Sequence, residues 1–303
     1  MKWIVAVALI GLSLLANPAR AEPAAPSASA GGNSSFSTTP AAAPEPEPQL
    51  ELGIGALALG LPDYRGADHY STRVLPLPYV VYRSPRLQMT RDGIRAWIFS
   101  TESLALNISA AASLPGDADD NPARTGMPKL DPTFEAGPSL DFKLAQSDDG
   151  HSRTKLRFPV RAVMATDGRH FNSTGWTFAP HVRVDLAQDW NTSKVLHLAN
   201  LGLIWSTAKY HDYFYGVAPE FANATRRLYE AHGGYSGARA SLSSRIRRDR
   251  WGFSVFVSYD WLHGAVFDDS PLFQTEHAVV SGIFVSYRLY ARGAQVPVSD
   301  DAP

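Results

Sequence analysis

The 303-residue sequence has no cysteine, no surplus of charge of either sign and only one long apolar run. The absence of cysteine excludes disulfides, thiolate metal sites and cysteine nucleophiles. Lys and Arg number 28 against 29 Asp and Glu, whereas a nucleic-acid-binding protein normally carries a basic surplus. A helical membrane protein is also excluded, because each span needs about 20 consecutive apolar residues and a single stretch comes close.

That apolar stretch lies at the start of the chain and is typical of a secretory signal peptide. Lys2 supplies a positive charge, Trp3 to Ala16 are mostly apolar, and Ala19-Arg20-Ala21 is a small-x-small cleavage site. We therefore expect a signal peptide over 1–21, cleavage near Ala21 and export of the mature chain.

Two further segments have compositions that do not support a core. Residues 22–48 are rich in Ala, Pro, Ser and Glu, and residues 291–303 form a polar tail with Arg292, Gln295, Ser299, Asp300 and Asp301. Such segments bury too little apolar surface to offset their conformational entropy. The expected organisation is a disordered tether over 22–48, a folded domain over 49–290 and a polar C-terminal tail over 291–303.

Within 49–290, apolar and polar residues alternate with a period of two, which predicts strands with two different faces. Trp251, Phe253, Val255 and Val257, for example, share one face of a strand. A soluble sandwich would bury such a face, whereas a transmembrane barrel would turn it toward lipid. Runs of about ten residues favour the barrel, because soluble strands average about five or six. Aromatic residues near strand ends, including Tyr79, would form its interface girdles.

The fold class predicted is all-β, a transmembrane antiparallel up-and-down barrel of about twelve strands, with ten as the alternative. The expected strands cover 50–61, 72–83, 85–91, 93–100, 102–115, 133–146, 152–166, 174–188, 193–208, 235–248, 251–264 and 276–290. If the first strand runs outward, the short connections fall on the periplasmic side and the long ones fall outside, as in outer-membrane barrels. We therefore expect the domain 49–290 to lie in the outer membrane of a Gram-negative cell.

Charged residues on the polar faces of these strands are expected to point into the barrel. They are Glu135, Asp141, Lys143, Arg157, Arg161, Arg183, Asp185, Arg239, Arg245 and Arg247. We expect Arg157, Arg161, Arg239 and Arg245 to pair with Glu135, Asp141 and Asp185 and so to plug the interior. In the alternative, the same side chains line a narrow, anion-tolerant channel.

The long connection 209–234 is too aromatic for a merely solvated loop. It contains Tyr213, Phe214, Tyr215, Arg226 and Arg227, residue types that often anchor interfaces. Two roles remain open for it. The loop either folds inward and caps the mouth of the barrel, or it recognises a partner.

Several blocks of sequence occur in the order seen in one known family. They are Tyr64-Arg65-Gly66-Ala67-Asp68, Leu75-Pro76-Leu77-Pro78-Tyr79, Tyr213-Phe214-Tyr215-Gly216-Val217 and the segment 262–272, which includes Asp268-Asp269-Ser270-Pro271-Leu272. Over residues 50–290 the chain resembles the MltA-interacting protein (MipA/OmpV) family of outer-membrane barrels. One departure is that Leu289-Tyr290 is followed by a polar tail, where the family usually stops at an aromatic residue.

The resemblance implies a non-catalytic outer-membrane barrel, in contact with lipid, that links a murein hydrolase and a murein synthase on the periplasmic side. A porin-like channel or a surface adhesin is the alternative, since relatives are also described in these terms. The resemblance implies no catalytic residue, cofactor or metal.

Sequence motifs that suggest catalysis are incomplete. Ser206-Thr207-Ala208-Lys209 matches S-x-x-K, but the S-D-N and K-T-G elements of penicillin-recognising enzymes are absent. An outer-membrane lipid hydrolase would need serine, histidine and asparagine together at the outer rim, which the sequence does not place, and it stays the lesser alternative. The acidic stretches 117–120 and 268–269 are expected to be solvated loops rather than calcium sites. We therefore assign no catalytic, cofactor-binding or metal-binding residue.

Overall fold

The computed structural model describes residues 47–90, 93–114, 121–190 and 193–296. The expected signal peptide, the expected tether up to residue 46 and residues 297–303 of the expected tail lie outside the described residues. The acidic stretch 117–120 does so as well.

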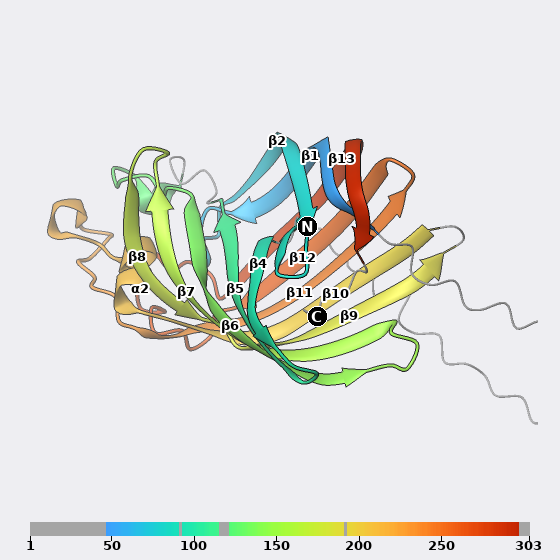
Figure 1. The fold of residues 1–303 in the computed structure, drawn as a ribbon. Helices are drawn as coiled ribbons and strands as arrows, with labels where there is room; N and C mark the ends of the chain where they lie inside the picture. Colours follow the sequence, from blue (N-terminus) through green and yellow to red (C-terminus); the bar gives the residue numbers. More distant parts are fainter. Residues whose placement is uncertain (1–46, 91–92, 115–120, 191–192, 297–303) are drawn as a thin grey trace, which may run out of the picture. The chain divides into compact units, whose positions relative to one another are not determined.

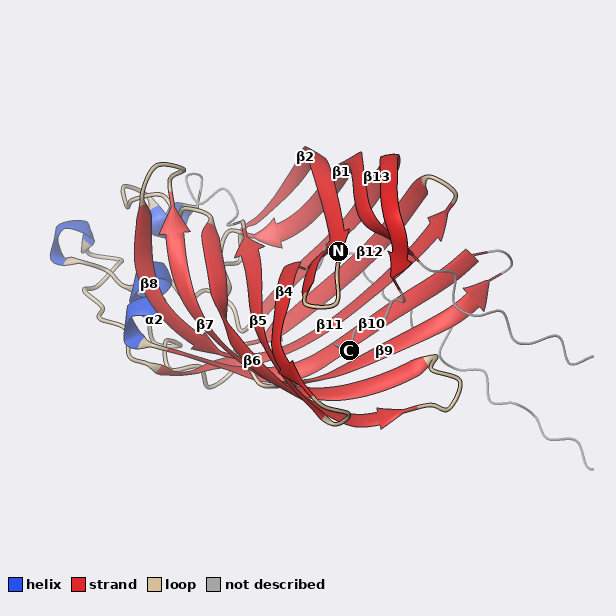
Figure 2. Cartoon of the chain, viewed as in Figure 1, coloured by secondary structure: helices blue, strands red, loops and turns tan. Residues whose placement is uncertain are grey.

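The described residues form one antiparallel sheet of thirteen strands that closes on itself (Figures 1 and 2). The strands are β1 (Glu47–Pro62), β2 (Tyr70–Arg83), β3 (Leu87–Thr90), β4 (Gly93–Ser100), β5 (Leu104–Ser113), β6 (Thr133–Gln146), β7 (Ser152–Thr166), β8 (Phe171–Phe178), β9 (His181–Trp190), β10 (Ser193–Ser206), β11 (Gly234–Arg248), β12 (Trp251–Trp261) and β13 (His277–Val296). The ladder between β1 and β13 closes the barrel.

Strands β8 and β9 share one place in the wall, so the thirteen segments make twelve strands around the barrel. β8 pairs with the later half of β7, β9 pairs with the earlier half, and both also pair with β10. The break falls at Ala179 and Pro180, because proline has no N–H to donate to a ladder. The prediction of a twelve-stranded antiparallel barrel is confirmed, and the strand expected over 174–188 is interrupted at Pro180.

The first and last strands are longer than expected from the sequence. β1 begins at Glu47, where a tether was expected to continue, and β13 runs to Val296, where a tail was expected. Glu47 pairs with Val296 and Pro48 with Gln295, so each strand supplies the hydrogen-bonding partner that extends the other.

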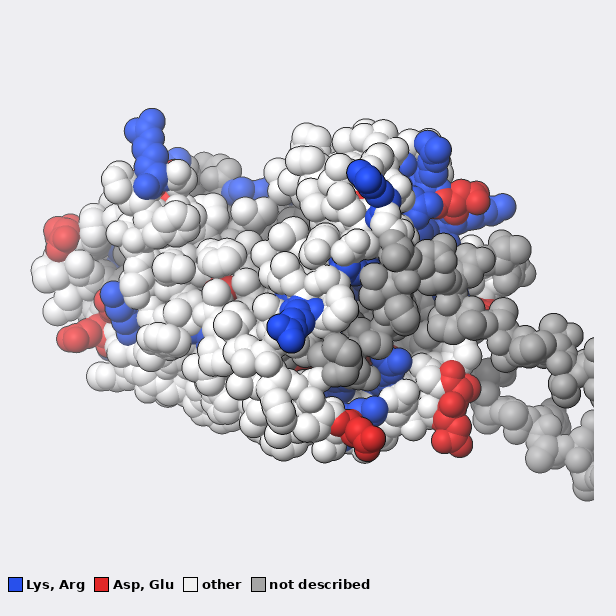
Figure 3. Space-filling model, viewed as in Figure 1, with Lys and Arg blue, Asp and Glu red and all other residues white. Residues whose placement is uncertain are grey.

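Side chains alternate between the two faces of the wall. On β12, Trp251 and Phe253 face outward and are exposed, whereas Asp260 faces inward and is buried. On the side of the molecule shown in Figure 3, charged side chains are scattered, a few of them near the middle of the view, and large uncharged areas lie between them. Tyr79 corrects one expectation. It faces inward on β2 and is buried, so it takes no part in an outward aromatic girdle.

The two ends of the barrel differ in the length of their connections. At one end, which we call the short-turn end, strands are joined by turns such as Asp249-Arg250. At the other, the long-loop end, the connections hold η2 (Pro122–Arg124), α2 (Ala208–Tyr215) and η3 (Pro219–Phe221). No helix among the described residues is long and apolar enough to cross a membrane.

Candidate functional site

A group of charged residues covers the inward face of β6, β7 and β9. We call it the basic wall, and its cations are Lys143, Lys155, Arg157, Arg161 and Arg183. At its centre Arg157 Nε donates to Asp141 Oδ2 at 2.9 Å, and both side chains are buried. Asp141 also accepts hydrogen bonds from Asn107 at 3.0 Å and from Ser139 at 2.6 Å. The carboxylate is thus held by three donors, as a buried charge requires.

Two further ion pairs flank this one. Arg161 Nη1 lies 3.5 Å from Glu135 Oε2 on the neighbouring strand, and Arg183 Nε donates to Asp185 Oδ1 at 2.7 Å. The structure therefore places Arg157 and Arg161 beside two of the acids expected to pair with them. Asp185 pairs with Arg183, two residues away on the same strand.

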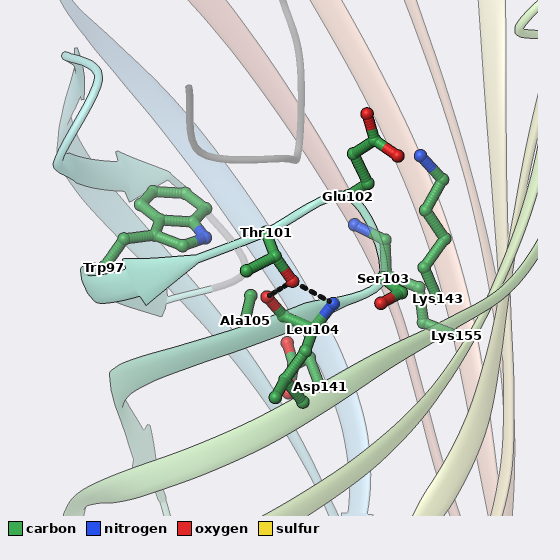
Figure 4. Close-up of a pocket in the computed structure, with 9 residues that line it drawn as sticks. All are labelled: Trp97, Thr101, Glu102, Ser103, Leu104, Ala105, Asp141, Lys143 and Lys155. Carbon is green, nitrogen blue, oxygen red and sulfur yellow. Dashed lines mark hydrogen bonds between the residues drawn. The ribbon is translucent and has the colours of Figure 1, made fainter.

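Positive charge is concentrated along one row of the basic wall. Lys143 lies opposite Lys155 across β6 and β7, and Lys155 lies opposite Arg183 across β7 and β9. The two lysines also line a small pocket of about 20 Å³, where Figure 4 shows their side chains beside Glu102. Like charges at directly opposed positions destabilise a sheet, so this row of cations lowers the stability of the barrel. The same concentration of positive charge attracts anions.

Two acids that the sequence interpretation missed bind Arg83, Arg239 and Arg247. Glu51 on β1 is fully buried and accepts hydrogen bonds from Arg83 and Arg247, each at 2.8 Å. Asp260 on β12 binds Arg239, which was expected to pair with an acid of β6 or β9. A lone acid at an inward position of a largely uncharged strand is the signal that could have identified both. Arg245 lies on the same inward face of β11 as Arg239 and Arg247.

The connections at the long-loop end pack together into one unit, which we call the loop cap. Its buried cluster contains Tyr64, Ala67, Leu130, Tyr215, Val217, Ala265, Phe267 and Leu272. Tyr215 stacks on Phe267 with ring centroids 3.7 Å apart, and the Tyr64 hydroxyl donates to the Leu272 carbonyl at 2.6 Å. Three of the sequence blocks that carried the family resemblance thus meet in this cluster.

Most of the loop residues singled out in the sequence are used inside the loop cap. Arg226 is buried and donates to the carbonyls of Ala123 at 2.8 Å and Phe221 at 2.9 Å. The Tyr213 hydroxyl accepts from the Asp131 amide at 2.8 Å, the Phe214 carbonyl accepts from Arg124 at 2.9 Å, and Tyr215 lies in the buried cluster. Arg227 is exposed, with Asp269 at 3.6 Å.

Arg65 and His211 fasten the loop cap to the barrel wall. Arg65 donates to Asp260 at 2.6 Å and to the Ser236 carbonyl at 2.8 Å. His211 is fully buried, with Nδ1 2.6 Å from the His232 carbonyl oxygen and Nε2 2.6 Å from Ser236 Oγ. Burial lowers the pKa of His211, so the ring is neutral, Nδ1–H donates to the carbonyl and Nε2 accepts from Ser236.

The described residues include serine–histidine contacts, whose surroundings differ from those of a catalytic pair. His211 and Ser236 are both fully buried, and the second ring nitrogen of His211 meets a carbonyl rather than a carboxylate. His197 lies 2.8 Å from Ser244 on the outward face of β10 and β11. No group of three or more His, Cys, Asp or Glu among the described residues could hold a metal ion. The charged groups of this interior form ion pairs and can attract anions.

Comparison with known proteins gives one family and several distant structures. A family model described as "MltA-interacting protein MipA" matches residues 54–289. The NanC porin is 8% identical, with 78% of this chain and 100% of that chain covered and a TM-score of 0.35. A bacterial polysaccharide outer membrane secretin is 8% identical over 80% of this chain and 99% of that chain, also with a TM-score of 0.35. No curated protein matches the chain.

Proposed function

Because the chain belongs to the MltA-interacting protein MipA family, we propose that it is a non-catalytic outer-membrane barrel that links a murein hydrolase and a murein synthase in the periplasm. The observation that carries the membrane location is the outward face of the wall. Ile54, Val74, Leu201 and Ile283 lie on this face and are each more than half exposed. A β-barrel with an apolar outer surface is one of the two structures that span a bilayer, because its strands satisfy one another's backbone hydrogen bonds.

The partners are proposed to bind at the short-turn end. The family description names an interaction with MltA, and we place the matching surface of this chain on the turns around 147–151 and 249–250. In the orientation usual for outer-membrane barrels, short turns face the periplasm. The murein enzymes would therefore meet this end and not the loop cap.

Site-directed photo-crosslinking in native cells tests this proposal. A photoreactive residue at Asp148, exposed on a turn, is expected to capture a murein hydrolase or synthase. The same residue at Arg227, exposed on the loop cap, is the matched control and should capture neither enzyme. Capture of a murein enzyme from Arg227 only, or from neither position while the barrel is present in the outer membrane, would contradict the proposed role.

A second function, a narrow anion-tolerant channel, is supported by the row of cations on the basic wall. If the ion pairs plug the interior, replacing both Arg157 and Arg161 by Ala should raise the single-channel conductance in planar bilayers and lower thermal stability. Deletion of 218–232 should also raise conductance, because this segment belongs to the loop cap. Unchanged conductance in both variants would argue that neither group obstructs an ion path.

A further inference from the structure

The interior has a second wall that differs in chemistry from the basic wall. The middle of β12, β13, β1 and β2 carries large apolar residues at inward positions, and we call this surface the apolar wall. Its main residues are Leu57, Leu75, Leu77, Tyr79, Phe256 and Phe284. The register places Leu57 opposite Leu75 on one side and Phe284 on the other. In the circular order of strands, the apolar wall lies across the barrel from β6, β7 and β9.

Aromatic rings on the apolar wall lie flat over glycines instead of projecting across the barrel. A Cβ added to Gly55 would lie 2.6 Å from the Phe284 ring, and one added to Gly282 would lie 2.6 Å from the Phe256 ring. Tyr79 covers Gly53 in the same way and meets Phe284 edge to face, with centroids 6.5 Å apart. The glycines therefore keep this wall smooth and present the faces of the rings to the interior.

One edge of the apolar wall borders a gap in the strand pairing between β2 and the strands that follow it, which we call the seam. β2 pairs with β1 along Tyr70–Tyr82, but on its other edge it pairs, among the described residues, only at Tyr82 and Arg83 with β3. The strands that follow β2 along the wall are shorter, because β3 has 4 residues and β4 has 8, against 14 in β2. Leu77 lies along this seam and is 37% exposed, although it is an inward residue of β2.

Two prolines make this edge unsuitable for another strand. Ser84 donates to Leu87 and Tyr82 pairs with Met89, so the even-numbered residues of β2 direct their backbone groups toward β3. Pro76 and Pro78 are also even-numbered residues of β2, so their backbone nitrogens face the seam. Proline nitrogens carry no N–H and cannot donate a hydrogen bond to an added strand. Prolines on an edge prevent strand addition, which argues that the seam admits a small molecule rather than a partner strand.

The basic wall has hydrogen-bonding capacity that its own acids do not use. Arg157 Nη2 is buried and has no hydrogen-bond partner, while Asp141 is already held by Arg157, Asn107 and Ser139. Arg95 lies opposite Ser109 across β4 and β5, and Ser109 Oγ accepts a hydrogen bond from Arg161 at 3.1 Å, so like charges gather on this part of the wall. An anion placed among these guanidinium groups would satisfy the free donor and relieve the repulsion.

We propose that the barrel interior binds a single-chain anionic amphiphile, with its hydrocarbon chain on the apolar wall and its charged head near Arg95 and Arg157. The seam beside β2 is its route from the membrane, and only this route depends on the proposed membrane location. A fatty acid has the required chemistry, because one chain meets a smooth apolar surface and one carboxylate meets a cluster of arginines.

Photolabelling of the full-length protein in phosphatidylcholine nanodiscs tests the proposal, with a palmitate that carries a diazirine on its chain as the probe. We expect saturable labelling of the inward residues Leu75 and Leu77, located by peptide mass spectrometry. Unlabelled palmitate should compete, and hexadecanol, which has the same chain without the charge, should not.

Arg95→Gln should weaken competition by palmitate about tenfold, the loss expected for one charge-assisted hydrogen bond. Lys194→Gln, an exposed cation at the short-turn end, is the matched control and should behave as the unaltered protein does.

Three results would overturn the proposal. Labelling confined to the outward residues Val74 and Val80 would show that the probe stays in the lipid. Equal competition by hexadecanol, or an Arg95→Gln variant that competes as the unaltered protein does, would show that the arginines do not bind the head. Because the purified protein is used alone, the outcome is independent of whether murein enzymes bind to it.

Discussion

The outward and inward faces of the barrel wall are made by the same strands but are stabilised in different ways. On β13, the outward residue Ile283 is exposed and contributes only apolar surface. On β6, the inward residue Asp141 is buried and accepts hydrogen bonds from three particular side chains. An apolar side chain in lipid can be exchanged for another of similar size. A buried charge cannot be exchanged in this way, because its partner would be left unpaired. The outward face therefore tolerates variation, and the inward face depends on particular pairs.

The largest effect is expected where an inward pair is broken. Asp141→Ala leaves Arg157 buried without its counter-charge, and removing one partner of a buried pair typically costs about 3–5 kcal/mol. The free energy of unfolding of the refolded barrel, measured by urea titration in lipid vesicles, should fall by about this amount. Asp148→Ala, which alters an exposed turn, is the control and should change stability by less than about 0.5 kcal/mol. Equal effects of the two substitutions would mean that the basic wall does not hold the barrel together.

A charge placed on the outward face tests the other half of the comparison. Ile283→Arg puts a guanidinium near the middle of the apolar outer surface and should destabilise the barrel by about 2–4 kcal/mol in vesicles. Ser258→Arg, on the inward face of β12 two residues from Asp260, is the matched control and should cost clearly less. If Ser258→Arg proves the more damaging change, the assignment of the two faces is reversed.

The two faces also differ in how far the sequence reveals them. The alternation of apolar and polar residues predicted nearly every strand. It could do so because an outward position requires only an apolar side chain, whichever residues lie on the neighbouring strands. The pairing of Arg239 with Asp260, and of Arg247 with Glu51, was not predictable in this way. These contacts depend on which strands become neighbours when the barrel closes, and that is a property of the whole wall. Pro180 was visible in the sequence, but its effect depends on the strands that flank it.

The loop cap was predicted as a choice between two roles, and its core could not be derived from one loop alone. Tyr64, Tyr215, Phe267 and Leu272 come from three connections that are far apart in the sequence. The aromatic residues of the long loop 209–234, among them Tyr213, Phe214 and Tyr215, indicated that this loop was not merely solvated. The stacking of Tyr215 on Phe267 required the closed barrel to bring the connections together.

A smaller effect is expected in the loop cap, which belongs to neither face of the wall. Tyr64→Phe removes the hydroxyl that donates to the buried Leu272 carbonyl, a loss of about 1–3 kcal/mol that should be confined to the cap. Hydrogen exchange of residues 262–276 should become faster, while exchange in β12 and β13 should not change. Faster exchange throughout the barrel would show that cap and wall unfold as one unit.

The smallest effect is a pH dependence of the same region. Because burial holds the pKa of His211 below its usual value of about 6.5, the unfolded cap binds a proton more readily than the folded cap. Stability of the cap should therefore be constant above about pH 6.5 and should decrease as the pH falls below it. Limited proteolysis of the 207–233 connection at pH 7.5 and pH 5.5 measures this. His211→Gln should remove the difference, and a difference that persists in this variant would assign it to other groups.

The central claim, that the outward face of the wall meets lipid, is tested most directly by spin labelling along β12. The chain has no cysteine, so a single cysteine at each position from 251 to 261 gives one label without background. In vesicles, labels at Phe253, Val255 and Val257 should collide often with lipid-dissolved oxygen and rarely with a water-soluble nickel complex. Labels at Gly252, Ser254 and Ser258 should lack this preference, which gives a period of two along the strand. Outward labels that the nickel complex reaches as readily as oxygen does would contradict a membrane-spanning wall.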